Sequence, residues 1–268
     1  MRLALVVNRA SGRGAAPPRV GEEFTLGELD RIPPDVERIA VAGGDGSIAP
    51  VAELAGRLDV PLAVIPTGTA NDFARAHGLP LEVEQAAELA RSGTVTQPFE
   101  LGHLSTGRPF VNVASAGLSS VAGRRAQPLK SRFGPLAYGL GAVRAAATGT
   151  PLQLTVEVDG TTRFEGAAWQ VMVACTGAFG GGSGIGAADA TDGVLDVVII
   201  PAGSRLALAR RAWGLRTQTI ERQRKVEHFV GGVVAVDGAG ELNCDGEFVA
   251  GGLERVTARA NAFRLVTR

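Results

Sequence analysis

The first third of the chain repeats one pattern, in which an apolar run is followed by a glycine-rich turn and then by a helical segment. Three apolar, β-branched runs carry the pattern, at residues 3–8, 38–42 and 61–66. Helices are predicted after the second run through Leu58, after the third run toward His77, and over 82–93, where apolar residues recur at helical spacing. Strands that alternate with helices predict a parallel sheet with helices packed on its faces.

From about residue 98 the pattern changes to short, β-rich segments. Asp-Gly pairs, which favour tight turns, separate several of these segments, at 159–160, 237–238 and 245–246. Repeated strands with such turns predict an antiparallel sandwich or barrel, with helices inserted over about 135–148 and 204–216. We therefore predict an α/β domain over 1–95 and a β-rich domain over 96–268.

Each glycine-rich turn follows a predicted parallel strand, so the three turns meet at one edge of the sheet. Glycines let backbone N–H groups approach an anion closely, and two of the turns open helices whose dipoles favour negative charge. The sequence therefore predicts a polyphosphate site, although a plain structural role for any single turn stays open. The candidate residues are Asn8, Ser11 and Gly12 in the first turn, Gly43, Gly44, Asp45, Gly46 and Ser47 in the second, and Gly68, Thr69 and Asn71 in the third.

Asp45 lies among the glycines where an anion would bind, and an unpaired carboxylate there would repel phosphate. A divalent cation that bridges the carboxylate and the phosphate removes this conflict. We therefore expect Mg²⁺ at the phosphates, with Asp45 acting on the metal side.

A second acidic motif lies near the end of the chain, at Asp245 and Glu247. In an extended segment, residues two positions apart point to the same face. Paired carboxylates allow one to position metal or water while the other takes a proton. A hairpin turn without a chemical role is the alternative explanation of the same Asp-Gly pair.

Composition narrows the function classes. The 268-residue chain is 45% hydrophobic and carries 27 basic and 27 acidic residues, which disfavours disorder and general nucleic-acid binding. Cys175 and Cys244 are its two cysteines, so a disulfide scaffold or a zinc ribbon is disfavoured and a reducing cytoplasm is expected. Its apolar runs are too short or too rich in glycine for a secretory signal or a transmembrane helix.

The segments GGDGS and GTANDFAR resemble the catalytic domain of the diacylglycerol kinase family, in particular the soluble bacterial lipid kinases related to sphingosine kinases. Four further segments resemble the family in the family's order: VVNRASGRG, FELGHLSTGRPFVNVASAGLSS, GGGSGIGAADATDGVLDVVII and NCDGEFV. The resemblance implies an α/β nucleotide-binding domain like that of NAD kinase and phosphofructokinase, then an antiparallel β-sandwich domain. It places the active site in the cleft between the two.

By the same resemblance, the three glycine turns bind ATP, and a structural Mg²⁺ is held in one turn of the second domain by Asp189, Asp192 and the carbonyl of Val194. Glu247 is implied as the base that takes the proton of the lipid hydroxyl, with Asp245 supporting its placement. The expected function is an ATP-dependent lipid kinase that acts on diacylglycerol or a related lipid at the inner face of the membrane. Whether it forms a homodimer stays open.

The chain departs from the family at two places. Ala49 and Pro50 stand where Asn and Glu usually follow GGDGS. Residues 13–37 contain four prolines and leave room for one short helix at most, so we expect a strand–helix unit to be missing. These departures keep open a degenerate protein that binds nucleotide or lipid without catalysis, and NAD kinase is the enzymatic alternative.

Four basic residues could contact anionic lipid headgroups. They are Arg124, Arg125, Lys130 and Arg132. A solvated basic loop explains the same cluster, so contact with the membrane is an expectation that the cluster supports without requiring it.

Overall fold

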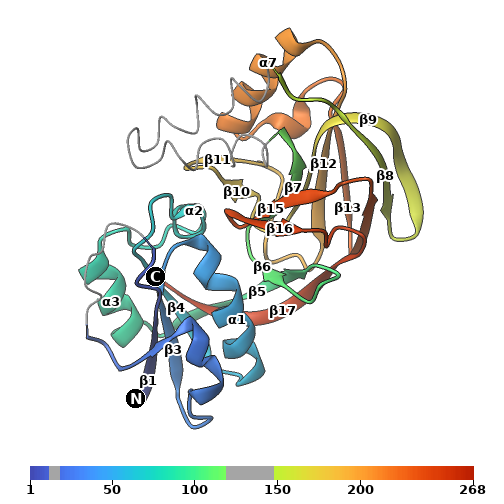
Figure 1. The fold of residues 1–268 in the computed structure, drawn as a ribbon. Helices are drawn as coiled ribbons and strands as arrows, with labels where there is room; N and C mark the ends of the chain where they lie inside the picture. Colours follow the sequence, from blue (N-terminus) through green and yellow to red (C-terminus); the bar gives the residue numbers. More distant parts are fainter. Residues whose placement is uncertain (12–18, 119–147) are drawn as a thin grey trace.

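The computed structural model describes residues 1–11, 19–118 and 148–268 (Figure 1). The predicted parallel sheet is confirmed in the first part of the chain. Its strands run in the order β2-β1-β3-β4 and all pair in parallel. Their bounds are Leu3–Val7 for β1, Glu22–Thr25 for β2, Arg38–Gly43 for β3 and Pro61–Pro66 for β4.

Helices cover both faces of this sheet, as the uninterrupted apolar runs predict. Helix α1 (Ile48–Arg57) packs on the face that carries Val6 and Val41. Helix α3 (Val83–Ser92) places three buried alanines on the opposite face, which carries Leu5 and Ile65. The short helix α2 (Asp72–Ala76) follows the third glycine turn.

One expectation for the first domain is wrong. Residues 19–37 hold a strand, β2, and then a 3-10 helix over Leu26–Arg31, rather than at most one short helix. In β2 only Phe24 is buried while its neighbours are exposed, and β2 is the last strand at this edge of the sheet. Residues 12–18 lie outside the described part of the chain.

The second part of the chain forms the predicted antiparallel β-sandwich. Strand β9 is its longest, and it pairs with β8 along its first half and with both β7 and β12 along its second. The strands are β5 (Val95–His103), β6 (Pro109–Phe110), β7 (Val113–Gly117), β8 (Leu152–Val158), β9 (Thr161–Ala174), β10 (Ala178–Phe179), β11 (Ser183–Gly184), β12 (Leu195–Pro201), β13 (Glu227–Gly231), β14 (Val233–Asp237), β15 (Glu241–Cys244), β16 (Glu247–Ala250) and β17 (Val256–Thr267).

Two long strands, β5 and β17, join the two layers (Figure 1). The first half of β17 pairs with β14 in the sandwich, and its second half pairs in parallel with β4 in the first sheet. At Gly56 of α1, a Cβ atom would lie 1.8 Å from the carbonyl oxygen of Ala262. The helix and β17 can approach this closely only because residue 56 has no side chain.

The helix predicted over 204–216 is confirmed as α7 (Arg205–Arg216), which is followed by a 3-10 turn at Ile220–Arg222. Both pack on the sandwich through a small core that includes Trp169, Met172 and Leu208. The helix predicted over 135–148 and the basic cluster at 124–132 fall outside the described residues, apart from Thr148. Within the described ranges, no helix is long and apolar enough to cross a bilayer.

Candidate functional site

The three glycine turns lie together at the carboxyl edge of β1, β3 and β4. The second and third turns touch, because a Cβ atom on Gly68 would lie only 2.5 Å from the Cα of Gly44. The backbone N–H of Thr67 donates to the carbonyl of Gly43 at 3.0 Å. The two turns therefore form one continuous glycine-lined surface on which backbone atoms can approach a ligand.

Side chains of the first turn brace the second and third turns. Asn8 donates from Nδ2 to Oγ of Ser47 at 2.8 Å. The Oγ of Ser11 donates to the carbonyl of Asn8 at 2.8 Å and lies 3.4 Å from Oγ1 of Thr67. Ser47 stands at the N-cap position of α1 but makes no side-chain capping bond. These contacts fix the edge of the sheet, and the first turn's Gly12 lies outside the described residues.

Asn71 holds the third turn in shape. It has a left-handed backbone (φ 52°), and its Nδ2 donates to the carbonyl of Gly68 at 3.0 Å. Among the described contacts, its Oδ1 is buried without a hydrogen-bond partner. A buried polar atom without a hydrogen-bond partner reduces the stability of the fold. A bound ligand or metal ion could supply the missing partner of this oxygen. Thr69, in contrast, is exposed.

Asp45 connects the second turn to two other parts of the molecule. Its Oδ1 accepts from the backbone N–H of Phe73, in the first turn of α2, at 2.9 Å. The same oxygen accepts from Nδ2 of Asn112, in the second domain, at 3.4 Å. These bonds involve Oδ1, so Oδ2 is the oxygen that the described contacts leave for a cation.

Asp245 and Gly246 form the two-residue turn of the β15–β16 hairpin, with φ of 48° and 88°. The expectation of an extended segment at this motif is therefore wrong, because both residues adopt the left-handed conformations of a tight hairpin turn. The carboxylate of Asp245 accepts three backbone N–H bonds, from Val111 at 2.8 Å, Asn112 at 2.9 Å and Val113 at 3.1 Å. Burial raises the pKa of Asp245 to about 7, although these three donors lower it.

Glu247, at the start of β16, reaches the second glycine turn. Its Oε2 accepts from Nη2 of Arg108 at 2.5 Å. A Cβ atom on Gly46 would lie 2.8 Å from Oε1 of Glu247. The Glu247 side chain is 55% exposed. The structure thus brings a second-domain carboxylate, open to solvent, against the glycine turn of the first domain.

Asn112 is a site residue that the sequence analysis missed. It is 2% exposed, and its backbone N–H and its side-chain amide bond the two aspartates, Asp245 and Asp45. Its Oδ1 accepts from Oγ1 of Thr176 at 2.6 Å. The sequence did carry a signal, because Asn112 is the one polar residue inside the apolar run PFVNVA. A buried side-chain amide needs hydrogen-bond partners, so a residue of this kind indicates polar groups close by.

Asp72 is a second residue whose role was missed. It is 5% exposed, and its carboxylate accepts from the backbone N–H groups of Gly181 at 3.0 Å and Gly182 at 2.8 Å. Burial raises the pKa of Asp72, and the charge of Asp45 adds to the rise. The two aspartates therefore place negative charge where the first domain contacts the second, and a cation would be stabilised there.

The expected metal turn forms a separate acidic group. Asp189 accepts from Thr191, and Asp192 accepts from the backbone N–H of Val194 at 3.0 Å. Burial raises the pKa of Asp192, and the nearby charges of Asp196 and Asp189 raise it further. In the described ranges no group of three or more His, Cys, Asp or Glu side chains could by itself hold a metal ion, so a site here would need backbone carbonyls or water.

Glu100 lies next to the metal turn and supports its fit to a cation. It is 1% exposed, and its Oε2 accepts from the backbone N–H of Gly193 at 2.8 Å. Burial and the charge of Asp192 raise the pKa of Glu100 to about 7. Its Oε1 is buried without a hydrogen-bond partner among the described contacts. Oxygen donors that repel one another fit a hard cation such as Mg²⁺.

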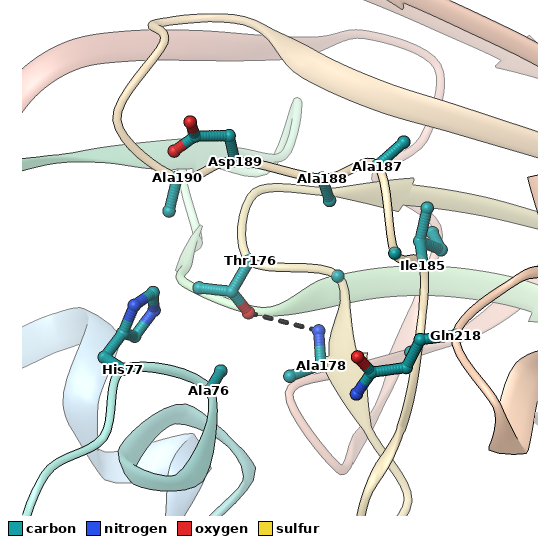
Figure 2. A pocket seen from close by; sticks show the side chains of 13 residues that line it. Ala76, His77, Thr176, Ala178, Ile185, Ala187, Ala188, Asp189, Ala190 and Gln218 are labelled. Carbon is teal, nitrogen blue, oxygen red and sulfur yellow. Dashed lines mark hydrogen bonds between the residues drawn. The ribbon is translucent and has the colours of Figure 1, made fainter.

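A cavity of about 450 Å³ lies between the end of α2 and the segment that follows β9. Figure 2 shows His77 on one side and Thr176, Ile185 and Gln218 on the others. Small residues form most of the remaining wall. Thr176 connects this cavity to Asp45 through Asn112. A ligand in the cavity would therefore lie close to Thr176, which Asn112 connects to Asp45 of the second glycine turn.

Two family models match the chain. The diacylglycerol kinase catalytic domain matches residues 25–104, and the YegS C-terminal NAD kinase beta sandwich-like domain matches residues 112–267. A diacylglycerol kinase of Bacillus subtilis is 33% identical over 222 residues, which are 80% of this chain and 72% of that protein. A Pseudomonas aeruginosa protein named "Probable lipid kinase YegS-like" is 37% identical over 52% of this chain and 46% of its own length.

Solved structures share the fold. A diacylglycerol kinase of Bacillus anthracis has a TM-score of 0.79 at 20% identity and covers 100% of this chain and 97% of its own. An NAD kinase of Archaeoglobus fulgidus in complex with ATP has a TM-score of 0.52 at 16% identity, with 100% and 94% covered. At these identities the likeness supports the α/β domain and β-sandwich architecture.

Proposed function

Because the chain belongs to the diacylglycerol kinase family and carries a YegS-type C-terminal domain, we propose that it transfers the γ-phosphoryl group of ATP to the hydroxyl of diacylglycerol or a related lipid. In this proposal the glycine turns bind the nucleotide phosphates. The second domain supplies the group that activates the lipid hydroxyl. The reaction takes place where a cytoplasmic protein meets the membrane surface.

The contact between Glu247 and Gly46 carries the proposal. Phosphoryl transfer needs the acceptor oxygen, the phosphate and a proton-accepting group to be held together. Oε1 of Glu247 lies against the turn on which the phosphates would bind, while Oε2 is held by Arg108. A carboxylate in this position can take the proton of an alcohol as its oxygen attacks phosphorus.

The glycine turns fit a nucleotide and Mg²⁺. The contact of Gly44 with Gly68 leaves no room for side chains, so backbone N–H groups can face the phosphates directly. Asn71 Oδ1 and Asp45 Oδ2 are acceptors that the described contacts leave for ligand or metal. When bound, Mg²⁺ would neutralise charge on the phosphates. The residues of this chain hold the phosphates in place and take up the proton.

The departure at Ala49 and Pro50 does not remove the site. Ala49 is 2% exposed and packs in the core beneath α1. Pro50 lies in the first turn of α1, where a missing backbone N–H costs nothing in helical hydrogen bonds. Both positions thus fit the helix, so the departure leaves the fold around the glycine turns intact.

The test is an assay with ATP labelled in its γ-phosphate, run with Mg²⁺ against diacylglycerol, other glycerolipids, a sphingoid base and NAD. We expect label in at least one hydroxyl lipid and none in NAD. Label in NAD alone would establish an NAD kinase instead. ATP binding without transfer to any acceptor would establish a non-catalytic binder.

A further inference from the structure

Helix α7 carries apolar side chains on two faces, one that packs on the core and one that is exposed to solvent. Leu208 and Gly214 are buried and face the sandwich. Leu206 and Trp213 are 88% and 69% exposed, the two highest values for large apolar side chains in the described part of the chain. They are seven positions apart, nearly two helical turns, so they lie on one line along the outward face.

The segment that carries this pair is basic. Helix α7 carries four arginines, and the stretch from 202 to 220 contains no Asp or Glu. Arg210 lies between Leu206 and Trp213 on the outward side, one turn from each. Arg216, in the last turn, donates to the carbonyl of Gly182 and is exposed. We call this surface, made of Leu206, Arg210, Trp213 and Arg216, the α7 face.

The α7 face is continuous with the candidate site. Arg216 binds Gly182, one of the two glycines whose N–H groups bind Asp72. Gln218, two residues after the helix, lines the same cavity as His77 and Thr176 (Figure 2). A surface that docks on α7 would therefore lie close to this cavity.

We propose that the α7 face is the surface with which the protein docks on an anionic lipid bilayer. Tryptophan and leucine favour the boundary of headgroups and acyl chains, and arginines beside them can bind the lipid phosphates. The charge complements anionic headgroups, and no carboxylate on the helix opposes it. This inference takes its motive from the proposed function, since the acceptor is a lipid, but docking is measured without catalysis.

The first test is binding to vesicles of phosphatidylcholine alone or mixed with phosphatidylglycerol, without ATP. We expect binding to the mixed vesicles that weakens as salt rises. The double variant Leu206→Asp, Trp213→Asp should bind at least about tenfold more weakly, because both apolar anchors are lost. Leu81→Asp, which changes another exposed leucine outside α7, is the matched control and should bind like the wild type.

Charge is tested separately with Arg210→Glu, which should weaken binding to mixed vesicles several-fold at low salt and little at high salt. Arg255→Glu reverses an exposed charge on the turn before β17 and is its control. Lipids brominated in the acyl chain should quench the fluorescence of Trp213. The variant Trp213→Phe, which keeps only the buried Trp169, should lose that quenching.

Three results would overturn the inference. The wild type could fail to bind mixed vesicles at any salt concentration, or the double variant could bind them as well as the wild type. The wild type could also form a dimer that the double variant breaks, with no vesicle binding, which would assign the α7 face to a second copy of the chain. Vesicle binding without kinase activity would leave docking standing and reject the proposed function, so the two failures are distinguishable.

Discussion

Asp245 and Glu247 lie on either side of Gly246 at one hairpin turn, but their carboxylates meet different surroundings. Asp245 accepts three backbone N–H bonds from the strand connection at 111–113. Glu247 stands open to solvent with one arginine partner. At the scale of single residues, the first carboxylate therefore organises the second domain's edge, and the second is the one to which the proposed function assigns the proton transfer.

Asp245→Asn should destabilise the fold, because the new amide group turns an N–H donor toward one of the three backbone donors. We expect a loss of about 1–3 kcal/mol in the free energy of unfolding, measured by urea denaturation. Glu247→Gln is the matched control and should unfold like the wild type. Equal stability of Asp245→Asn and the wild type would contradict the backbone-binding role.

His77 should make the fold sensitive to acid. Burial lowers the pKa of His77 to about 4 from 6.5, and its ring packs between Phe73 and Phe99. Below pH 6.5 His77 therefore binds a proton in the unfolded chain, whereas in the folded chain it stays neutral down to about pH 4. The stability associated with the neutral ring is present above pH 6.5 and is lost as the pH falls toward 4.

The variant His77→Phe keeps an aromatic ring and removes this titration. Between pH 7.5 and pH 5, the free energy of unfolding should fall by about 1–2 kcal/mol more in the wild type than in the variant. Urea midpoints at the two pH values measure the difference. Parallel changes in the wild type and in the variant would show that His77 does not titrate in this way.

At the scale of elements, the sequence predicted what local pattern controls and missed what depends on distant partners. The runs at 3–8, 38–42 and 61–66 became β1, β3 and β4, because apolar residues on both sides suit a covered parallel strand. Strand β2 was missed, since EEFT buries a single side chain. The meeting of Asn112 with Asp45 and Asp245 joins residues far apart in the chain, and no local spacing encodes it.

The contact between the second and third glycine turns gives a prediction about the nucleotide. Gly68→Ala would force its Cβ against Gly44 and separate the turns. We expect the affinity for Mg-ATP, measured by calorimetry, to fall at least about tenfold, which corresponds to about 1.4 kcal/mol. Gly27→Ala has no comparable neighbour and should bind ATP normally. If Gly68→Ala binds Mg-ATP as tightly as the wild type, the contact between the two turns does not contribute to nucleotide binding.

The turn before β12 gives a prediction about metal. If Asp192 and its neighbours hold Mg²⁺, the ion should raise the melting temperature of the wild type by mass action. Asp192→Asn should remove most of that gain in thermal unfolding experiments. Asp237→Asn changes an exposed aspartate at the end of β14 and should keep it. If Mg²⁺ raises the melting temperature of Asp192→Asn as much as that of the wild type, the turn does not bind the ion.

At the scale of the whole molecule, contacts between the two domains assemble the candidate site. Asp72 of α2 binds the glycine turn at 181–182, and Glu247 of β16 lies on Gly46. Strands β5 and β17 run from one layer into the other. The sequence indicated two parts of different texture, but the return of β17 to the first sheet was not predicted, because the pairing of β17 with β4 joins residues about 200 positions apart in the chain.

The central claim is that Glu247 takes the proton of a lipid hydroxyl whose oxygen attacks ATP bound on the glycine turns. The most direct measurement compares Glu247→Gln with the wild type for turnover on lipid and for affinity for Mg-ATP. The variant keeps the size of the side chain and loses its basicity, so we predict that turnover falls at least about a hundredfold while ATP affinity stays nearly unchanged. A variant that phosphorylates lipid at the wild-type rate would contradict the account.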